Sequence, residues 1–213
     1  MREANVRLQR IDELTRREHY FLREEDACYY FGEYTSRNGT AYSIASSLVH
    51  DLLELRDPAI PKQEFRKDRA LSRVAQWIGG VFDQDSLPLA TFVPLPQSGS
   101  GILTDNDDRI YRILKRSAEG LDIRRMVELV KGGALLDVGS VRSGPDVLYE
   151  SMRVVLSLTE PRPRAIFLVD DVLTTGANFV AAKRRLAQVM PDVPVYGLFV
   201  ARKTLDSGAI LGR

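Results

Sequence analysis

The stretch AIFLVDDVLTTGANF, residues 165–179, decides the fold of this chain. Its first five residues, 165–169, are all apolar and predict a strand that is buried on both faces, as in a parallel sheet. After a polar turn, apolar residues recur at helical spacing, at Phe179, Ala182, Leu186 and Val189. A second apolar run, VYGLFV at 195–200, predicts the next strand. The order strand, helix, strand predicts a βαβ unit with parallel strands and a right-handed crossover.

The other apolar patterns extend this unit into a single α/β domain of 213 residues. The run LPLATFVPL, at 87–95, predicts a further buried strand. The aromatic run ACYYFGEYT, at 27–35, predicts a strand or the arm of a tight hairpin. Helices are expected at 43–55, 64–82, 108–117 and 123–131, with a weakly amphipathic one at 5–18. We therefore expect a Rossmann-like, open, mostly parallel sheet with helices on both faces. Its core would span 86–205, preceded by an N-terminal helical or hairpin region at 1–85, and the glycine-rich residues 132–146 would form an exposed excursion.

Composition excludes several functional classes. The 30 basic and 29 acidic side chains give a formal charge of +1, which argues against a broad surface for duplex nucleic acid but leaves room for a local basic rim. No apolar run approaches the length that spans a bilayer, and the charged N-terminus lacks the apolar core of a signal peptide. We expect a cytoplasmic protein without membrane contact.

The sulfur and imidazole side chains are few. Cys28 is the single cysteine, so no internal disulfide can form, and we expect it to be a small buried residue rather than a nucleophile. The two histidines, His19 and His50, are too few for a histidine-based metal cluster. Both are expected on the surface of a helix or loop.

Polar residues follow the strand at 165–169, at the edge where open α/β sheets bind their ligands. The turn offers backbone N–H groups, two hydroxyls and the positive end of a helix dipole, which together can hold a phosphate; its residues are Thr174, Thr175, Gly176, Ala177 and Asn178. The adjacent carboxylates of Asp170 and Asp171 can accept hydrogen bonds from vicinal hydroxyls of a sugar. A buried strand that ends in an Asp-Asp turn, with a threonine as N-cap of the next helix, would explain one threonine. It would not explain two adjacent acids, whose mutual repulsion costs free energy. The segment therefore predicts a ribose 5-phosphate site.

This segment resembles the phosphoribosyl pyrophosphate signature of the type I phosphoribosyltransferases: four apolar residues, two acids, two intervening residues and Thr-Thr-Gly. It is most similar to relatives of the competence-associated amidophosphoribosyltransferase-like proteins, which share DDVLTTGA. The resemblance implies that Asp170 and Asp171 hold the ribose 2′ and 3′ hydroxyls and that residues 174–178 hold the 5′-phosphate. It also implies a pyrophosphate loop within TFVPLPQSGSG at 91–101, with Gln97, Ser98 and Gly99 as candidates. A mobile catalytic loop would lie between 130 and 150, and an N-terminal hood would cover the acceptor.

The implied reaction is transfer of ribose 5-phosphate from phosphoribosyl pyrophosphate to a small nitrogenous acceptor, through a transition state of oxocarbenium character. Mg²⁺ would be held by ligand oxygens and water, together with Asp170 and Asp171. Two positions depart from the family: Asn178 replaces a threonine or serine, and Thr174 replaces the acid that acts as a general base in some members. One alternative is a non-catalytic sensor of phosphoribosyl pyrophosphate or a nucleotide that controls a partner protein. A hydrolase on the same scaffold and a homodimer also stay open.

Several other residues have two interpretations each. The acidic loop of Asp105, Asp107, Asp108 and Arg109 could place a carboxylate near Mg²⁺ or Arg109 near the pyrophosphate, or it could be a solvated helix start. Arg202 and Lys203 could bind pyrophosphate or be exposed charges that close the last strand, and Arg142 is equally ambiguous. The aromatic residues Tyr29, Tyr30, Phe31 and Tyr34 could stack on an acceptor base or pack in the core, and Glu33 beside them would be harder to explain structurally.

Overall fold

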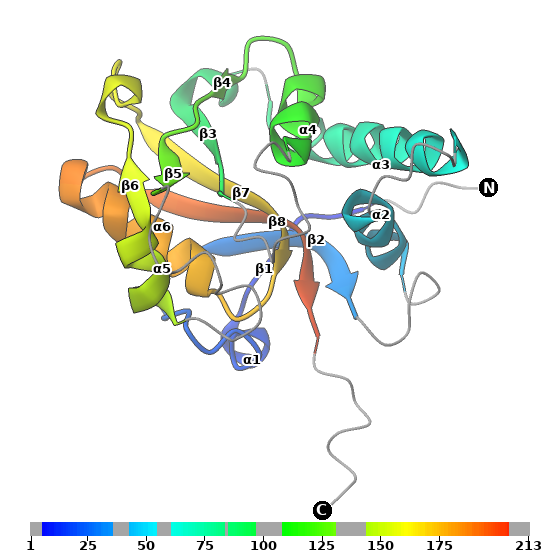
Figure 1. The fold of residues 1–213 in the computed structure, drawn as a ribbon, viewed down its shortest axis with the longest axis horizontal. Coiled ribbons are helices and arrows are strands. Elements are labelled where there is room, and N and C mark those ends of the chain that lie inside the picture. Colours follow the sequence, from blue (N-terminus) through cyan, green and yellow to red (C-terminus); the bar gives the residue numbers. More distant parts are fainter. Residues whose placement is uncertain are drawn as a thin grey trace, which may run out of the picture.

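The computed structural model describes residues 6–35, 43–54, 61–83, 85–96, 108–130 and 144–204. Its centre is a six-stranded sheet in the order β1-β2-β8-β7-β3-β4 (Figure 1). The strands are β1 (Gln9–Arg10), β2 (Cys28–Tyr34), β3 (Ala90–Pro94), β4 (Asp122–Ile123), β7 (Ala165–Leu173) and β8 (Val195–Lys203). All neighbours pair in parallel except β1 and β2. The expected α/β class with a mostly parallel sheet is confirmed.

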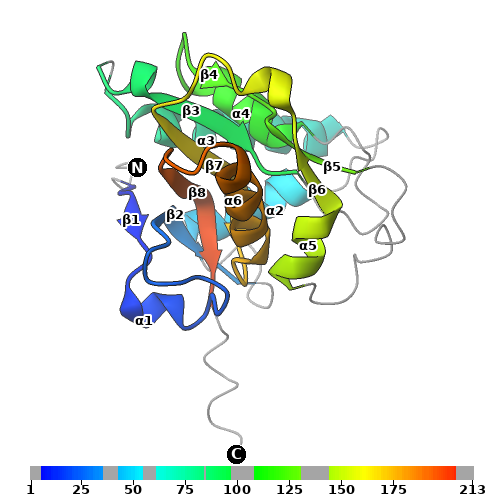
Figure 2. The same ribbon diagram turned by 90° about the vertical axis from the view of Figure 1, so that its left-hand side faces the viewer.

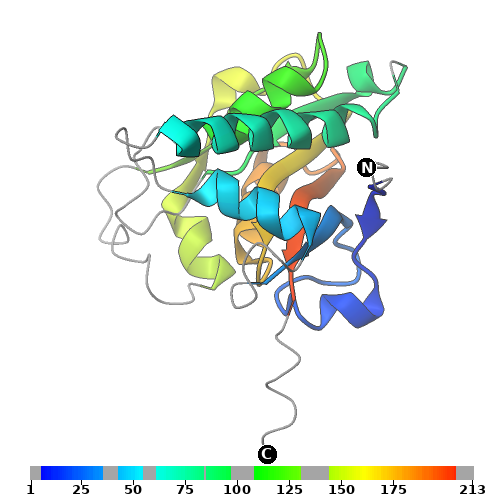
Figure 3. The same ribbon diagram turned by 90° about the vertical axis from the view of Figure 1, so that its right-hand side faces the viewer.

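Helices cover both faces of this sheet. One face carries α2 (Ile44–Leu53), α3 (Pro61–Gly79) and α4 (Arg109–Ser117), which stand in front of the sheet in Figure 3. The other face carries α6 (Ala177–Val189), beside α5 (Pro145–Ser151) and a small antiparallel sheet of β5 (Val127–Leu129) and β6 (Met152–Val154) (Figure 2). Shorter elements are α1 (Glu13–Arg16) and two 3₁₀ turns, Leu87–Leu89 and Leu156–Leu158.

The central strand β7 is buried on both faces, as the apolar run at 165–169 predicts. Ile166 and Leu168 belong to the apolar cluster under α6, whereas Val169 belongs to the cluster under α2, α3 and α4. This division follows from the alternation of side chains along a strand. The strand continues past Val169 to Leu173, so both acids of the signature lie within it.

The βαβ unit is confirmed, because β7 and β8 pair in parallel on either side of α6. The aromatic run at 27–35 is a strand, which pairs in parallel with β8 and antiparallel with β1. The helices expected at 43–55, 64–82 and 108–117 are present as α2, α3 and α4. No helix among the described residues is long and apolar enough to cross a membrane.

Two expected helices are wrong. Within 5–18 the chain forms strand β1 and only the four-residue helix α1, which a capping box between Asp12 and Thr15 begins. Residues 123–131 contain the end of β4 and all of β5, because Val127 and Leu129 pair with Val154 and Met152. Pairing with a distant strand outweighs the local helical spacing there. Most of the excursion expected at 132–146 lies outside the described residues; Pro145 and Asp146 already belong to α5.

Candidate functional site

The candidate site lies at the carboxyl ends of the parallel strands, where β7 leads into α6. Asp170 and Asp171 are buried there, 8% and 6% exposed. Asp170 accepts a hydrogen bond from the backbone N–H of Asp171 at 2.9 Å, and Asp171 accepts one from the N–H of Val172 at 2.8 Å. Because the two residues are consecutive in a strand, their carboxylates leave it in opposite directions. The sequence grouped them as one pair, and the structure gives them different surroundings.

Asp171 faces a buried arginine. Arg109, the first residue of α4, is only 1% exposed, and its Nε and Nη2 lie 2.7 and 2.6 Å from Oδ2 of Asp171. The interpretation of Arg109 as part of a solvated helix start is therefore wrong, since its guanidinium lies in the core. Both charges have lost their hydration, so the pair is stable only because the guanidinium and the carboxylate contact each other closely.

Asp170 faces a hollow beside the turn. This hollow has a volume of about 110 Å³ and is lined by Asp170, Val172, Leu173, Thr174, Gly176, Asn178, Phe179 and Phe199. It combines a carboxylate acceptor with the turn at the N-terminus of α6, so it suits a small polar group such as a phosphate next to a hydroxyl-bearing ring.

The turn itself has the geometry of an anion-binding helix start. Gly176 is the N-cap of α6 and has a φ of 86°, a left-handed conformation that favours glycine. Thr175 Oγ1 lies 3.4 Å from the N–H of Ala177. Within the described parts of the chain, the N–H groups of Thr175, Gly176 and Asn178 have no protein acceptor. Unsatisfied N–H groups at the positive end of a helix are the donors that bind phosphates.

Asn178 connects this turn to the strand that precedes the predicted pyrophosphate loop. Its Nδ2 donates to the carbonyl oxygen of Pro96 at 3.3 Å. The loop candidates Gln97, Ser98 and Gly99 follow directly but lie outside the described residues, as do Arg142, Asp105 and Asp107. The turn at 174–178 and the segment that ends at Pro96 are thus neighbours, and the resemblance assigns both segments to one ligand. The side-chain amide of Asn178 forms the contact between them.

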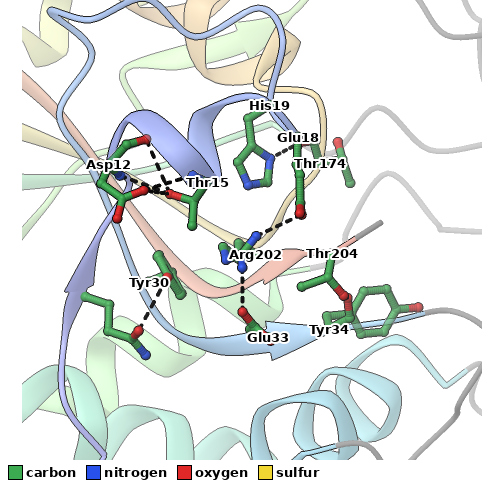
Figure 4. A network of polar contacts seen from close by, with 11 residues as sticks. Asp12, Thr15, Glu18, His19, Tyr30, Glu33, Tyr34, Thr174, Arg202 and Thr204 are labelled. Atoms are coloured by element: carbon green, nitrogen blue, oxygen red, sulfur yellow. Dashed lines mark hydrogen bonds and ion pairs between the residues drawn. The ribbon is translucent and has the colours of Figure 1, made fainter. Parts of the chain in front are cut away.

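An N-terminal segment, residues 12–26, crosses over the turn; we call it the strap. His19 Nδ1 forms a hydrogen bond with the carbonyl oxygen of Thr174 (Figure 4), and the N–H of Phe21 donates to the carbonyl oxygen of Thr175 at 3.1 Å. His19 is fully buried, so its expected surface position is wrong. A Cβ on Gly176 would lie 2.7 Å from Cδ2 of Leu22, so the close approach of the strap also requires glycine there.

Arg202 attaches the strap to the sheet. It is 7% exposed at the end of β8; its Nη1 lies 2.8 Å from Glu18 in the strap, and its Nη2 donates to Glu33 of β2 (Figure 4). Its guanidinium also lies over the ring of Tyr30, 5.5 Å from the centroid. The interpretation of Arg202 as an exposed charge is wrong, and this ion pair explains Glu33. Lys203, next along the strand, is exposed.

The aromatic residues of β2 divide between core and site. Tyr30 and Phe31 are buried in the two core clusters, which confirms core packing for these two. Tyr34, at the carboxyl end of the strand, is half-buried beside His50, with ring centroids 5.3 Å apart. Burial, and then the carboxylate of Asp171, raise the pKa of Tyr34 above its usual value. Tyr34 therefore lies close enough to Asp171 of the candidate site to be affected by the charge of that carboxylate.

Few side chains are suited to hold a metal or act as a nucleophile. In the described ranges, no three or more His, Cys, Asp or Glu residues gather as a metal-binding group. Asp171 is a poor direct ligand for a divalent cation, because Arg109 already lies against its carboxylate. Asp170 fits better, as an outer contact to a cation that a ligand carries. Cys28 is buried as expected, and burial raises the pKa of its thiol, which disfavours the nucleophilic thiolate.

Sequence reasoning missed three residues that shape the site: His19, Arg109 as the partner of Asp171, and the strap residue Asp26, which accepts from Lys183 of α6 at 2.6 Å. No local pattern marks them, because each acts on a residue far along the chain. Comparisons with protein-family models and with curated proteins find no match to this chain.

Proposed function

We propose that this chain binds the ribose 5-phosphate moiety of phosphoribosyl pyrophosphate at the carboxyl ends of β7 and β3. With Mg²⁺, it would transfer that moiety to a small nitrogenous acceptor. The observation that carries the proposal is the turn at Thr174–Asn178. There, N–H groups that meet no acceptor among the described residues stand at the start of α6 beside a buried carboxylate. The N–H groups would bind a phosphate, and the carboxylate would accept a hydrogen bond from a neighbouring sugar hydroxyl.

The two acids would have different roles. Asp170 borders the hollow, so it is the residue we assign to a ribose hydroxyl. Asp171 is held by Arg109 and by the N–H of Val172, so its main role would be to fix the end of β7 and the start of α4 relative to each other. This division refines the expectation from the resemblance, in which both acids contact the ribose.

Transfer at the anomeric carbon requires no covalent bond between the protein and the ligand. The carbon–oxygen bond to pyrophosphate breaks as the bond to the acceptor nitrogen forms, and the acceptor loses a proton. The protein would contribute positioning and charge stabilisation. When bound with the ligand, Mg²⁺ would supply charge neutralisation for the pyrophosphate, and Asp170 would be its outer contact in the protein. The absence of an acid at Thr174 means that the proton would pass to another group or to solvent.

A second candidate function is a non-catalytic sensor of phosphoribosyl pyrophosphate or a nucleotide. The pair between Asp171 and Arg109 favours it, because one of the two acids is neutralised within the protein. A sensor needs the phosphate turn and Asp170, but it does not need a base or an acceptor pocket. The N-terminal region would then supply the surface for a partner protein, in place of an acceptor hood.

Binding and turnover can be tested separately. We expect isothermal titration calorimetry with phosphoribosyl pyrophosphate and Mg²⁺ to show binding, and Asp170→Asn to weaken it about tenfold or more, since a charge-assisted hydrogen bond is lost. The matched control is Asp192→Asn, an exposed acid that precedes β8 at the opposite edge of the sheet. Pyrophosphate release with a panel of nitrogenous acceptors then distinguishes enzyme from sensor.

Each outcome has a definite meaning. Binding with release supports the transferase, and tight binding without release from any acceptor favours the sensor. Unchanged affinity in Asp170→Asn removes that residue from the site. A wild-type protein that binds neither phosphoribosyl pyrophosphate nor ribose 5-phosphate contradicts the proposed function.

A further inference from the structure

The strap contacts the backbone of the turn through two hydrogen bonds. The carbonyl oxygens of Thr174 and Thr175 both accept hydrogen bonds from it, the first from His19 Nδ1 and the second from the N–H of Phe21. In a planar trans peptide the C=O and the following N–H point in opposite directions. Holding the two carbonyls against the strap therefore turns the N–H groups of Thr175 and Gly176 away from it. These are two of the donors that lack a protein acceptor in the described parts of the chain.

The strap is itself fixed on both sides of this contact. Before His19, Glu18 pairs with Arg202 of β8 at 2.8 Å. After Leu22, Asp26 pairs with Lys183 of α6 at 2.6 Å and also accepts from the N–H of Arg23 at 2.8 Å. The strap thus spans from the last strand to the helix that begins at the turn (Figure 4 shows its first half).

The contact is buried and closely packed. His19 is fully buried, and its Nε2 has no hydrogen-bond partner within the described residues. Leu22 is 6% exposed and covers Gly176 so closely that a Cβ would clash with its side chain. A segment that served only to cover an apolar surface would need no histidine, because burying an unpaired ring nitrogen costs free energy. The hydrogen bond to Thr174 is what the histidine contributes.

We propose that the strap is a positioning element for the phosphate turn, with His19 as the positioning residue that orients the 174–175 peptide for anion binding. This inference rests on the proposed function, since it assigns a task to a segment that the phosphate site would use. It goes beyond that function by making anion affinity depend on the region before β2. The ligand class concerned is the phosphomonoester, whichever group it carries.

Two variants of His19 separate the hydrogen bond from the bulk of the ring. His19→Ala removes the donor, whereas His19→Asn keeps an N–H near the position of Nδ1. We expect His19→Ala to weaken ribose 5-phosphate binding about tenfold and His19→Asn to restore affinity to within about threefold of wild type. Leu14→Ala, at a strap residue that is 72% exposed, is the matched control and should bind as wild type does.

A second measurement needs no ligand. Backbone ¹⁵N relaxation should give order parameters near about 0.85 at residues 174–176 in the wild type and below about 0.6 in His19→Ala. If His19→Ala is too unstable to study, Glu18→Gln provides a milder loosening of the strap, with an expected loss of about threefold in affinity at wild-type fold. Thermal unfolding of each variant confirms that the fold is retained.

The results distinguish the two proposals. A wild type that binds ribose 5-phosphate, together with His19→Ala that binds equally and keeps an ordered turn, overturns the role of the strap and leaves the proposed function standing. A wild type that binds neither ribose 5-phosphate nor inorganic phosphate overturns both. Weakened binding and lost order in His19→Ala, with recovery in His19→Asn, establish the positioning role.

Discussion

Two buried arginines, Arg109 and Arg202, lie near the candidate site at the carboxyl-end edge of the sheet, and they join different parts of the molecule. The side chain of Arg109 is 1% exposed, and that of its partner Asp171 is 8% exposed. The side chain of Arg202 is 8% exposed, but its partners Glu18 and Glu33 are 26% and 38% exposed. Arg109 joins two core elements, α4 and β7, whereas Arg202 joins the sheet to the strap.

This difference in burial determines what each pair can do. A fully buried pair is costly to break, because the charge that is left behind has no water. A pair whose carboxylates reach solvent is cheaper to break, because those groups can be hydrated again. We infer that the Arg109 pair fixes the core around β7 and that the Arg202 pair holds a segment that can respond to conditions without unfolding the domain.

The largest effect is expected when Arg109 is removed. Arg109→Met leaves Asp171 as an uncompensated buried charge, and the free energy of unfolding should fall by about 3–5 kcal/mol. Urea denaturation followed by circular dichroism measures this change. The double variant Arg109→Met with Asp171→Leu should recover most of the loss, since both charges are then gone. A loss below about 1 kcal/mol in the single variant would show that the pair is not closed to water.

Removal of Arg202 should have a smaller and more local effect. Arg202→Met should lower the free energy of unfolding by about 1–3 kcal/mol. The loss is smaller than for Arg109 because the carboxylates of Glu18 and Glu33 can be hydrated again when the arginine is removed. Limited proteolysis should cut the strap faster than in wild type while the remaining domain resists. The control Arg153→Met breaks an exposed pair with Glu128 on the small sheet and should change stability by less than about 0.5 kcal/mol. Equal losses in the Arg202 and Arg109 variants would erase the distinction between the two regions.

Local sequence patterns predicted the helices and strands whose apolar residues are consecutive or recur at a regular spacing. The unit β7-α6-β8 followed from five consecutive apolar residues, a polar turn and a helical period, and the candidate phosphate turn lies in its first connection. The helix expected at 123–131 was wrong because the apolar residues there are buried by pairing with β6. A short apolar run fits either element, and the distant partner decides between them.

The site residues that sequence reasoning missed act over long separations. Arg109 meets Asp171 across 62 positions, and His19 meets Thr174 across 155. An arginine that begins a helix and a histidine in a charged segment both look like surface residues when only their neighbours in sequence are considered. The turn was predictable because its chemistry is contiguous; the residues that orient it were not, because the fold brings them there.

The smallest expected effect is a pH dependence confined to the strap. Burial lowers the pKa of His19, the hydrogen bond to the Thr174 carbonyl opposes this shift, and Arg202 and Glu18 act in opposite directions. Because the folded pKa lies below the ordinary histidine value of about 6.5, the unfolded chain takes up a proton first as the pH falls. His19 therefore contributes stability that is fully present above about pH 6.5 and is lost as the pH falls toward the folded pKa, at up to about 1.4 kcal/mol per pH unit. Urea denaturation at pH 7.5, 6.5 and 5.5 should show a shallower decline in His19→Asn than in wild type. Identical slopes would contradict this assignment, because His19 would then not be the group that takes up the proton when the chain unfolds.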